Sequence, residues 1–555
     1  MMRRRGGLPR RERKPSSDHR RRRSKRKAGP AGGCQDLGPL ARLPGGSLRR
    51  GTELRCVVAG GSPVASRKAF TQPMVYAVAM RMKHDAIVIG SGEMACATAM
   101  EAAEHGLDVV LIDHASDGPD DHAEGASLLK WRIREAISRE LASLEVLAYG
   151  CRPPARPLLA QGAIWALRDR IVERYLSALR RRVAMSGVRQ ISGRARFASP
   201  HCVVLDCGGV HEAGIIAIAV GSRPRHPERF RFDQRVICDC HAVTRVDEAP
   251  RHLVIVGAEA AGLEFACMFA AIGSQVTVLD RRHQTLRYVD RELRQVLYGR
   301  MQSMGIDLIL GEDLNEIRTC GHGIGTHAEV ELSSGRVETC DRVLIEAGRA
   351  ANTTALGLGE VGIETDERGF IITDEYRHTS QHGVYAVGDA VANLGEVDLR
   401  EATVAIRHAT GAAVGFWEPS PLTIQTTPPI SMHGLTEEMC QRLDFPHAVG
   451  IARYSDLPFS EALGKGEGML KLVVSCDDRR VVGVHVIGEG ASELVHLGTA
   501  FTCSSGGIDE LANCPCVAHS LFEAYLVAAK DVRRRLGGRG VARVRGGGGG
   551  RGLRA

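Results

Sequence analysis

The sequence predicts an α/β protein with two Rossmann-like domains, the second inserted in the first, followed by a C-terminal α+β domain. Three observations support this fold class. Strand–turn–helix–strand units begin near residues 84 and 252, each of about 30 residues, the length of one βαβ unit. From about residue 418 the pattern changes, and apolar residues alternate in GMLKLVVSC and RVVGVHVIG as they do in antiparallel strands.

The net charge of +8 is distributed unevenly along the 555 residues. Residues 1–83 hold 22 basic and 4 acidic side chains and residues 531–555 hold 8 and 1, so the stretch between them carries −17. A folded nucleic-acid-binding protein usually has its basic surface on the body of the domain, which argues against nucleic acid as a partner. No apolar run approaches the ~18 residues of a membrane span, so no membrane association is expected.

The two ends are expected to lie outside the folded body. Residues 1–83 contain many arginines and no apolar segment typical of a secretory signal. They are expected to be a basic disordered tail or an over-long start, with Met82 as the natural first residue. The Gly/Arg-rich residues 531–555 are predicted to form a flexible tail. Sixteen scattered cysteines without a signal favour a reducing cytoplasm over a disulfide scaffold.

The first βαβ unit contains a predicted phosphate-binding turn. In GSGEMA, residues 90–95, Gly90 allows a tight turn and Gly92 lets a pyrophosphate approach the backbone at a helix N-terminus. Asp113 ends the next strand, where a carboxylate can hydrogen-bond a ribose hydroxyl. The expected cofactor-binding residues of this unit are Gly90, Ser91, Gly92, Ala95 and Asp113.

The second βαβ unit carries the motif GAEAAG from Gly257 to Gly262, with Glu259 in place of the middle glycine. A side chain there hinders close backbone approach, and its carboxylate repels a pyrophosphate. The sequence therefore leaves two expectations open. The turn binds a nucleotide, or the fold is retained and its affinity for the nucleotide is weakened.

The strand that follows this motif ends in a mixture of charges. Asp280 suits the 2′-hydroxyl of NAD(H), whereas Arg281, Arg282 and the later Arg287 suit the 2′-phosphate of NADP(H). The sequence leaves both nucleotides open.

A third element, VYAVGDA, contains Gly388 and Asp389. The order of GSGxxA, EAGRAANT, VYAVGDA and a C-terminal α+β domain resembles the two-dinucleotide-domain flavoprotein disulfide reductases over residues 84–535. Within that superfamily, long stretches such as GRAANTTALGLGEVGIETDERGF and FEAYLVAAKDVRRRL are similar to the soluble pyridine nucleotide transhydrogenases.

This resemblance implies cofactors and partners. It implies FAD in the first domain, with Asp113 at the adenosine ribose and Asp389 at the ribityl chain, and NAD(H) or NADP(H) in the second domain. It also implies a homodimer or higher homo-oligomer through the third. Further cofactor-binding glycines are expected at Gly221, Gly348 and Gly388. The implied domains are 84–249 with 349–417 for FAD, 250–348 for NAD(P) and 418–530 for dimerisation.

The resemblance also implies a catalytic ion pair beside the flavin N5 atom. Glu264 matches the glutamate of this pair in the second motif, and Lys130 lies near the position of the lysine. Trp131 fits the position of the lysine equally well, so the alignment leaves both open.

The sequence departs from the disulfide reductases in their dithiol chemistry. Residues 113–131 contain no cysteine, although the family has a Cys-x4-Cys pair there, and a Gly-Gly-x-Cys run of the transhydrogenases is missing as well. The family has its catalytic histidine five residues before a glutamate that corresponds to Glu523. In this sequence that position is Ala518, and His519 is one position away. These losses argue against a lipoamide or glutathione type of reductase, and the missing run puts tight flavin binding in question.

Other cysteine pairs are weaker candidates for redox chemistry. Cys514-Pro515-Cys516 precedes the final helix. Cys202 and Cys207 are expected to be small, half-buried hydrophobic residues, and Cys238 and Cys240 have no histidine pair with which to bind a metal. No histidine spacing is typical of a metal centre, and none is expected.

The resemblance and these departures together predict FAD-dependent transfer of hydride between NADPH and NAD⁺. The alternatives are a diaphorase or metal-ion reductase that uses Cys514 and Cys516, and a degenerate nucleotide-binding flavoprotein fold without turnover.

Overall fold

The computed structural model describes eight ranges of the chain: 81–113, 161–245, 248–321, 325–391, 398–415, 420–462, 466–504 and 506–537. All of them belong to a compact unit that spans Val75–Ala555. Lys130, Trp131 and all of the cysteine-free stretch 113–131 after Asp113 lie outside the described residues, as do both predicted tails up to residue 80 and from residue 538.

The first domain is built on a seven-stranded sheet with the order β3-β2-β1-β6-β5-β4, and β17 pairs with β6 beyond the end of β5. Strands β1, β2, β3, β6 and β17 are parallel, whereas β4 and β5 form an antiparallel meander. The strands are β1 (Arg81–Ile89), β2 (Val109–Asp113), β3 (Arg189–Ser192), β4 (Ala195–Ser199), β5 (Cys202–Leu205), β6 (Val210–Ile218) and β17 (Val384–Ala386).

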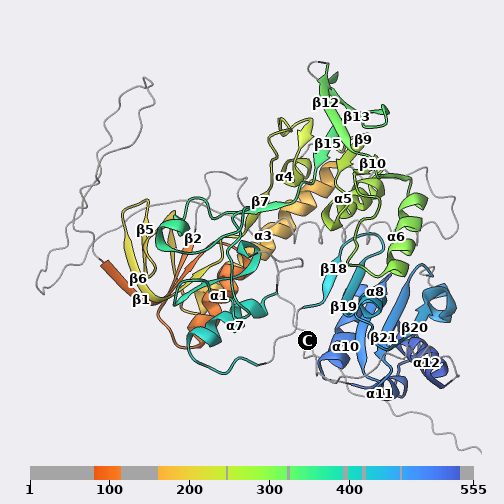
Figure 1. Cartoon of the computed structure of the whole chain (residues 1–555). Helices are drawn as coiled ribbons and strands as arrows, with labels where there is room; N and C mark the ends of the chain where they lie inside the picture. The colour runs from red at the N-terminus through yellow and green to blue at the C-terminus, as the bar shows by residue number, and fades with distance from the viewer. Residues whose placement is uncertain are drawn as a thin grey trace, which may run out of the picture. The chain divides into compact units, whose positions relative to one another are not determined.

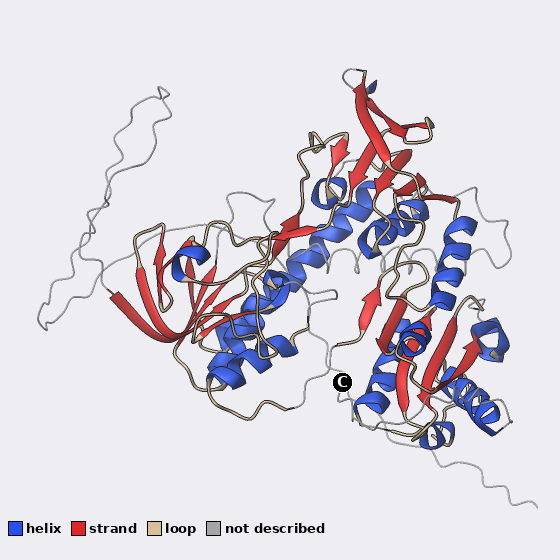
Figure 2. Ribbon diagram, in the orientation of Figure 1, coloured by secondary structure: helices blue, strands red, loops and turns tan. Residues whose placement is uncertain are grey.

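Three helices cover one face of this sheet, and loops cover the other (Figure 2). Helix α1 (Glu93–Glu104) follows the first glycine turn, and α3 (Gln161–Met185) and α7 (Arg400–Ala409) pack against it. The central strand β1 is buried on both faces over its last four residues, Ala86–Ile89. Such continuous apolar strands are typical of a parallel sheet covered on both sides.

The second domain repeats this arrangement with a five-stranded parallel sheet, β11-β10-β9-β15-β8. Its elements are β8 (Ile237–Cys238), α4 (Cys240–Val243), β9 (His252–Val256), α5 (Ala260–Ala271), β10 (Gln275–Asp280), α6 (Arg291–Ser303), β11 (Ile306–Leu310) and β15 (Arg342–Ile345).

Two smaller sheets accompany these domains. An antiparallel sheet of β12 (Leu314–Cys320), β13 (His327–Leu332) and β14 (Val337–Cys340) is inserted between β11 and β15. A two-stranded ladder of β7 (Ser222–Pro224) and β16 (Arg349–Ala351) lies where the chain passes from one domain to the other and back. The short 3-10 helices are η2 (Leu358–Val361) and η3 (Gly388–Ala390).

The C-terminal domain is a five-stranded antiparallel sheet, β18-β19-β22-β21-β20, as the alternating pattern predicts. Its strands are β18 (Leu422–Ile424), β19 (Ile430–Gly434), β20 (His447–Arg453), β21 (Met469–Ser475) and β22 (Val481–Ile487). Its helical elements are α8 (Glu437–Arg442), η4 (Tyr454–Asp456), α9 (Pro458–Ala462), α10 (Ala491–Cys503), α11 (Ile508–Ala512) and α12 (Glu523–Gly537).

Two predicted details differ from the structure. The first strand begins at Arg81 rather than near residue 84, so Met82 is paired within it, opposite His211. The last helix continues past residue 530 to Gly537, because Val532 is fully buried against the C-terminal sheet.

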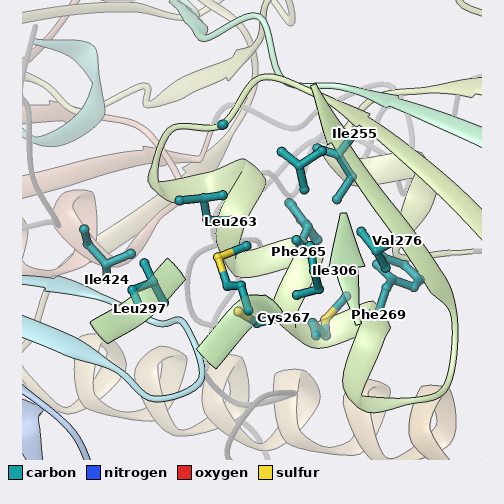
Figure 3. Packing of buried hydrophobic residues seen from close by; sticks show 14 of the residues in the cluster. Ile255, Leu263, Phe265, Cys267, Phe269, Val276, Leu297, Ile306 and Ile424 are labelled. Carbon is teal, nitrogen blue, oxygen red and sulfur yellow. The ribbon is translucent and has the colours of Figure 1, made fainter. Parts of the chain in front are cut away.

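One apolar cluster joins the second domain to the C-terminal domain. Leu263 of α5 lies beside Leu297 of α6 and Ile424 of β18, whereas Phe265 and Phe269 of α5 lie beside Ile306 of β11 and Val276 of β10 (Figure 3). Helix α5 therefore contributes to the core of the second domain and to its contact with the C-terminal domain. None of the helices in the described ranges is long and apolar enough to cross a membrane.

A buried cation lies at this same junction. Lys471 of β21 is 1% exposed, and its Nζ lies 2.8 Å from Asp290 Oδ2, 2.8 Å from Glu292 Oε2 and 2.6 Å from Glu437 Oε2. Burial alone lowers the pKa of Lys471, but the surrounding carboxylates outweigh it and hold the pKa above its usual value. Asp290 also caps α6 by accepting from the backbone N–H of Glu292 at 3.0 Å.

We predict that Lys471→Met destabilises the protein by about 3–5 kcal/mol, because it leaves the buried carboxylate of Asp290 without its cation. Urea unfolding followed by circular dichroism measures the effect. Lys83→Met is the matched control, since Lys83 is exposed on β1. A loss below ~1 kcal/mol, the range of surface ion pairs, would contradict the prediction.

Candidate functional site

The first glycine turn connects β1 to α1 and can only be made by glycine. Gly90 has φ +146°, and a Cβ on it would lie 2.2 Å from the carbonyl oxygen of Ala219, the residue directly after β6. Gly92 is the N-cap of α1, and no side chain caps this helix. The N–H groups of the first turn of α1 therefore keep their capacity to bind a phosphate group.

Asp113 is the last residue of β2, which lies parallel to β1 with Ile112 opposite Ile89. Because parallel strands end at the same edge, the Asp113 carboxyl and the Gly90 turn lie on one edge of the sheet. Asp113 is half-buried. A turn that requires glycine, an uncapped helix and this acid fit the pyrophosphate and the ribose of a dinucleotide.

The Gly388-Asp389 turn lies against the same helix. Gly388 has φ +65°, and a Cβ there would lie 3.0 Å from Cγ of Met94 on α1. Its N–H donates to Glu401 Oε2 at 2.7 Å, and Glu401 is buried in an ion pair with Arg377 at 3.0 Å. This buried pair fixes the turn, and no sequence motif indicated it, because Glu401 reads as an ordinary helical residue.

The structure also brings the Asp389 side chain to the β7–β16 ladder. Ser222 Oγ lies 3.3 Å from Asp389 Oδ2, and the Arg349 guanidinium lies 3.7 Å from the same oxygen. Gly221 and Gly348 precede the two strands, with φ of +68° and +87°. The predicted residues Gly221, Gly348 and Asp389 therefore belong to one site. Ser222 and Arg349 also belong to this site, and no sequence motif indicated them.

The second glycine turn connects β9 to α5 with the same close approach. Gly257 has φ +117°, and a Cβ on it would lie 2.4 Å from the carbonyl oxygen of Glu346. A Cβ on Gly262 would lie 1.9 Å from the carbonyl oxygen of Gly257. Glu259 occupies the N-cap position of α5 without a side-chain cap. The turn therefore keeps the shape of a phosphate-binding turn, with a carboxylate beside the helix N-terminus.

Arg282 connects the two acidic residues of this site. Its guanidinium binds Asp280 through two hydrogen bonds, of 2.9 Å to Oδ1 and 2.7 Å to Oδ2, and also pairs with Glu259. Asp280 accepts two further bonds, from the backbone N–H groups of Ala258 and Arg282, both at 2.9 Å. Four bonds fill the four lone-pair positions of a carboxylate, so a ribose hydroxyl must displace Arg282 to reach Asp280.

The charge balance of this site follows from the same contacts. Although burial acts to raise it, the pKa of Asp280 is held below its usual value by Arg282 and the backbone donors. Both Glu259 and Arg282 are about 45% exposed at their side chains, so solvent screens their pair. Arg281 and Arg287 are exposed on the segment between β10 and α6, and they add two positive charges to the segment that contains Arg282.

Glu264, the predicted catalytic glutamate, lies on α5 and is partly buried. Its Oε1 accepts a hydrogen bond from the backbone N–H of Gln425 at 2.7 Å, which connects α5 to the start of the C-terminal domain. Its expected partner Lys130 is outside the described residues, so the ion pair stays a prediction.

The cysteine pairs differ in accessibility. Cys516 is exposed, and Cys514 is partly buried, both after α11. Cys238 and Cys240 are buried, and burial raises the pKa of the Cys238 thiol to about 12, which suits a small core residue. Cys202 is partly buried and Cys207 is exposed on the meander of the first sheet.

A family model described as pyridine nucleotide-disulphide oxidoreductase matches residues 84–409, and the dimerisation-domain model of the same family matches residues 420–529. The first match covers more than half of the chain, and the chain therefore belongs to the pyridine nucleotide-disulphide oxidoreductase family. The protein is an oxidoreductase whose cofactors are FAD and a nicotinamide nucleotide.

Curated relatives narrow this class. The chain is 30% identical over 464 residues to the soluble pyridine nucleotide transhydrogenase of Photorhabdus laumondii, covering 81% of this chain and 98% of that protein. It is 28% identical over 462 residues to the protein of the same name from Mycobacterium tuberculosis, with 82% and 98% covered.

Solved structures agree on the fold. The HOCl-induced flavoprotein disulfide reductase RclA from Escherichia coli is 20% identical with a TM-score of 0.71, covering 80% of this chain and 99% of that one. LpdA from Mycobacterium tuberculosis is 22% identical with the same TM-score and the same coverage. At these identities the likeness supports the architecture alone.

We predict that Glu259→Gly lowers the Kd of NAD⁺ and NADP⁺ by about tenfold, or ~1.4 kcal/mol, because it removes a carboxylate and a Cβ from the phosphate-binding turn. Isothermal titration calorimetry with each oxidised nucleotide measures the change.

Glu259→Gln is the matched control, since it keeps the side chain and removes only the charge. If Glu259→Gln lowers the Kd as much as Glu259→Gly, charge repulsion weakens binding in the unchanged protein. If only Glu259→Gly lowers the Kd, the side chain weakens binding by hindering close approach of the nucleotide to the backbone. An unchanged Kd in both variants would show that the pair with Arg282 already cancels the effect of Glu259.

Proposed function

We propose that this protein transfers hydride between NADPH and NAD⁺ with bound FAD as the intermediate carrier. The observation that carries the proposal is the presence of two phosphate-binding turns, at Gly90 and Gly257, in a chain without cysteine between residues 113 and 131. A disulfide reductase needs a thiol pair next to its flavin, whereas a transhydrogenase needs only two nucleotides that bind in turn. The names of the curated relatives point in the same direction.

The residues divide into two binding sites. At the first, the N-terminus of α1 with Gly90, Gly92 and Asp113 would hold the FAD pyrophosphate and adenosine ribose, and Asp389 would hold the ribityl chain. Bound FAD supplies the capacity to accept and release a hydride. Arg349 and Ser222 orient the Asp389 carboxylate through the contacts given above.

At the second site, Gly257 and the N-terminus of α5 would hold the nicotinamide nucleotide. Arg282 is the residue that the two nucleotides would use differently. NADP(H) offers a 2′-phosphate to which a guanidinium can bind through two bonds, and movement of Arg282 toward it would release Asp280. NAD(H) offers a hydroxyl that would compete for Asp280 with Arg282 in place.

The C-terminal domain would join two copies of the chain, as the match to the dimerisation-domain model supports. A cytoplasmic location agrees with the exposed cysteines Cys207 and Cys516, which form no disulfide among the described residues.

We predict that the purified protein is yellow, that NADPH bleaches the flavin colour under anaerobic conditions, and that NAD⁺ then restores it. The reason is that one nucleotide delivers a hydride and the other removes it. Stopped-flow absorbance with NADPH and NADH in parallel measures flavin reduction, and mixing the reduced protein with NAD⁺ measures flavin reoxidation. A colourless protein that takes up no added FAD would overturn the proposal and favour a degenerate fold without turnover.

The exposed Cys516 and its neighbour Cys514 support a second candidate, a diaphorase or metal-ion reductase. Cys514→Ser/Cys516→Ser is expected to leave transhydrogenation unchanged, because that reaction requires no thiol. Steady-state rates with NAD⁺ and with Hg²⁺ as acceptors distinguish the two activities. Cys202→Ser/Cys207→Ser is the matched control, and a loss of transhydrogenation only in the first variant would assign the thiols to the reaction.

A further inference from the structure

Figure 1 shows the hairpin of β12 and β13 in the second domain. Three residues of these two strands have side chains of the types that ligate metal ions. Cys320 is directly opposite His327 in the antiparallel register, and Glu329 follows two residues later on β13. Opposite residues of an antiparallel pair lie on the same face, and so do residues two apart on one strand. The fold therefore gathers a thiol, an imidazole and a carboxylate that the sequence separates by up to nine positions.

The distances between these groups suit a metal ion. A sulfur, a ring nitrogen and a carboxylate oxygen of the three residues all lie within 4.8 Å of one another. Around a tetrahedral zinc ion, with ligands at about 2.0–2.3 Å, the ligand atoms are roughly 3.3–3.6 Å apart. Small side-chain rotations close this difference, and all three residues are partly exposed, so an ion can reach them.

The hydrogen bonds around the cluster leave its ligand atoms available. His327 Nδ1 lies 3.1 Å from the carbonyl oxygen of Gly325. A carbonyl oxygen only accepts, so Nδ1 carries the proton and Nε2 of the neutral ring keeps its lone pair. Metal-binding histidines usually have their other ring nitrogen bound in this way.

Glu329 is likewise not engaged by another charge. Arg318 lies opposite it in the register, but the Arg318 guanidinium pairs with Glu316 and Glu331. Across the described residues, no hydrogen bond or ion pair engages the Glu329 carboxylate.

The opposite face of the hairpin explains why these polar residues point outward. Ile317 packs against a core in which Ala328, Val330 and Leu332 are fully buried. The alternation fixes Cys320, His327 and Glu329 on the outer face, because a slip of one residue would expose that core.

We propose that Cys320, His327 and Glu329 form a binding site for one divalent transition-metal ion such as Zn²⁺. Sulfur and imidazole ligands favour Zn²⁺ or Co²⁺ over Mg²⁺ or Ca²⁺, which prefer oxygen ligands alone. Three protein ligands leave a fourth position for water. The site is on a different sheet from the glycine turn at Gly257. No metal was expected from the sequence, because the three residues form no recognised motif.

Co²⁺ titration of the full-length FAD-loaded protein tests this site. We expect one equivalent to bind, with a thiolate-to-cobalt charge-transfer band and visible bands of tetrahedral cobalt beyond the flavin absorption. Zn²⁺ alone should then displace the cobalt and abolish these bands. Absence of any thiolate–cobalt band would overturn the proposal, whatever the outcome of the hydride-transfer experiments.

Variants locate the ion on the hairpin. Cys320→Ser should abolish the charge-transfer band, and His327→Gln and Glu329→Gln should each raise the Kd for Zn²⁺ at least about tenfold, measured by competition with a chelating dye. All three positions are partly exposed, and far-ultraviolet circular dichroism confirms that each variant is folded.

Cys207→Ser and Cys514→Ser/Cys516→Ser are the controls, because Cys207 and Cys516 are exposed free thiols elsewhere. The proposal requires the band to survive in both controls. A band that persists in Cys320→Ser, or disappears in either control, would place the metal on another thiol and overturn the proposal.

Discussion

The close approach of each glycine turn to the backbone directly after a neighbouring strand is the constraint on which both binding sites depend. At Gly90 and at Gly257, a Cβ would come within 2.2 and 2.4 Å of a carbonyl oxygen, far inside any van der Waals contact. The missing side chains let α1 and α5 start directly at the edge of their sheets. Each helix N-terminus then lies beside the acid that ends the next strand, and this arrangement is what recognises a dinucleotide.

The second site combines this constraint with a local conflict of charge. Glu259 puts a carboxylate where a pyrophosphate is expected, and Arg282 partly neutralises it while also filling the lone pairs of Asp280. The guanidinium is therefore shared by two acids before any nucleotide arrives. A nucleotide that offered a phosphate to Arg282 would have to replace these contacts, and for this reason we propose that selectivity at this site depends on this side chain.

Contacts at the start of α5 and α6 connect this site to the C-terminal domain. Glu264 of α5 binds the backbone of Gln425, and the carboxylates at the N-terminus of α6 surround the buried Lys471. Because an unpaired charge in a protein interior is strongly unfavourable, these elements hold the two domains in one arrangement. The apolar cluster around Leu263 and Ile424 strengthens the same junction.

The sequence by itself determined the fold class, both glycine turns, Asp113, Asp280 and the family. These features depend on local periodicity and on glycines at fixed spacing, which the linear order of residues displays directly. Only the tertiary structure decided that Arg282 hydrogen-bonds both oxygens of Asp280 and that Glu401 fixes the Gly388 turn. It also decided that Cys320, His327 and Glu329 lie together on one face of a hairpin. These contacts depend on how a side chain is placed after a strand, on helix packing and on strand register, and none of these leaves a periodic signal in the sequence.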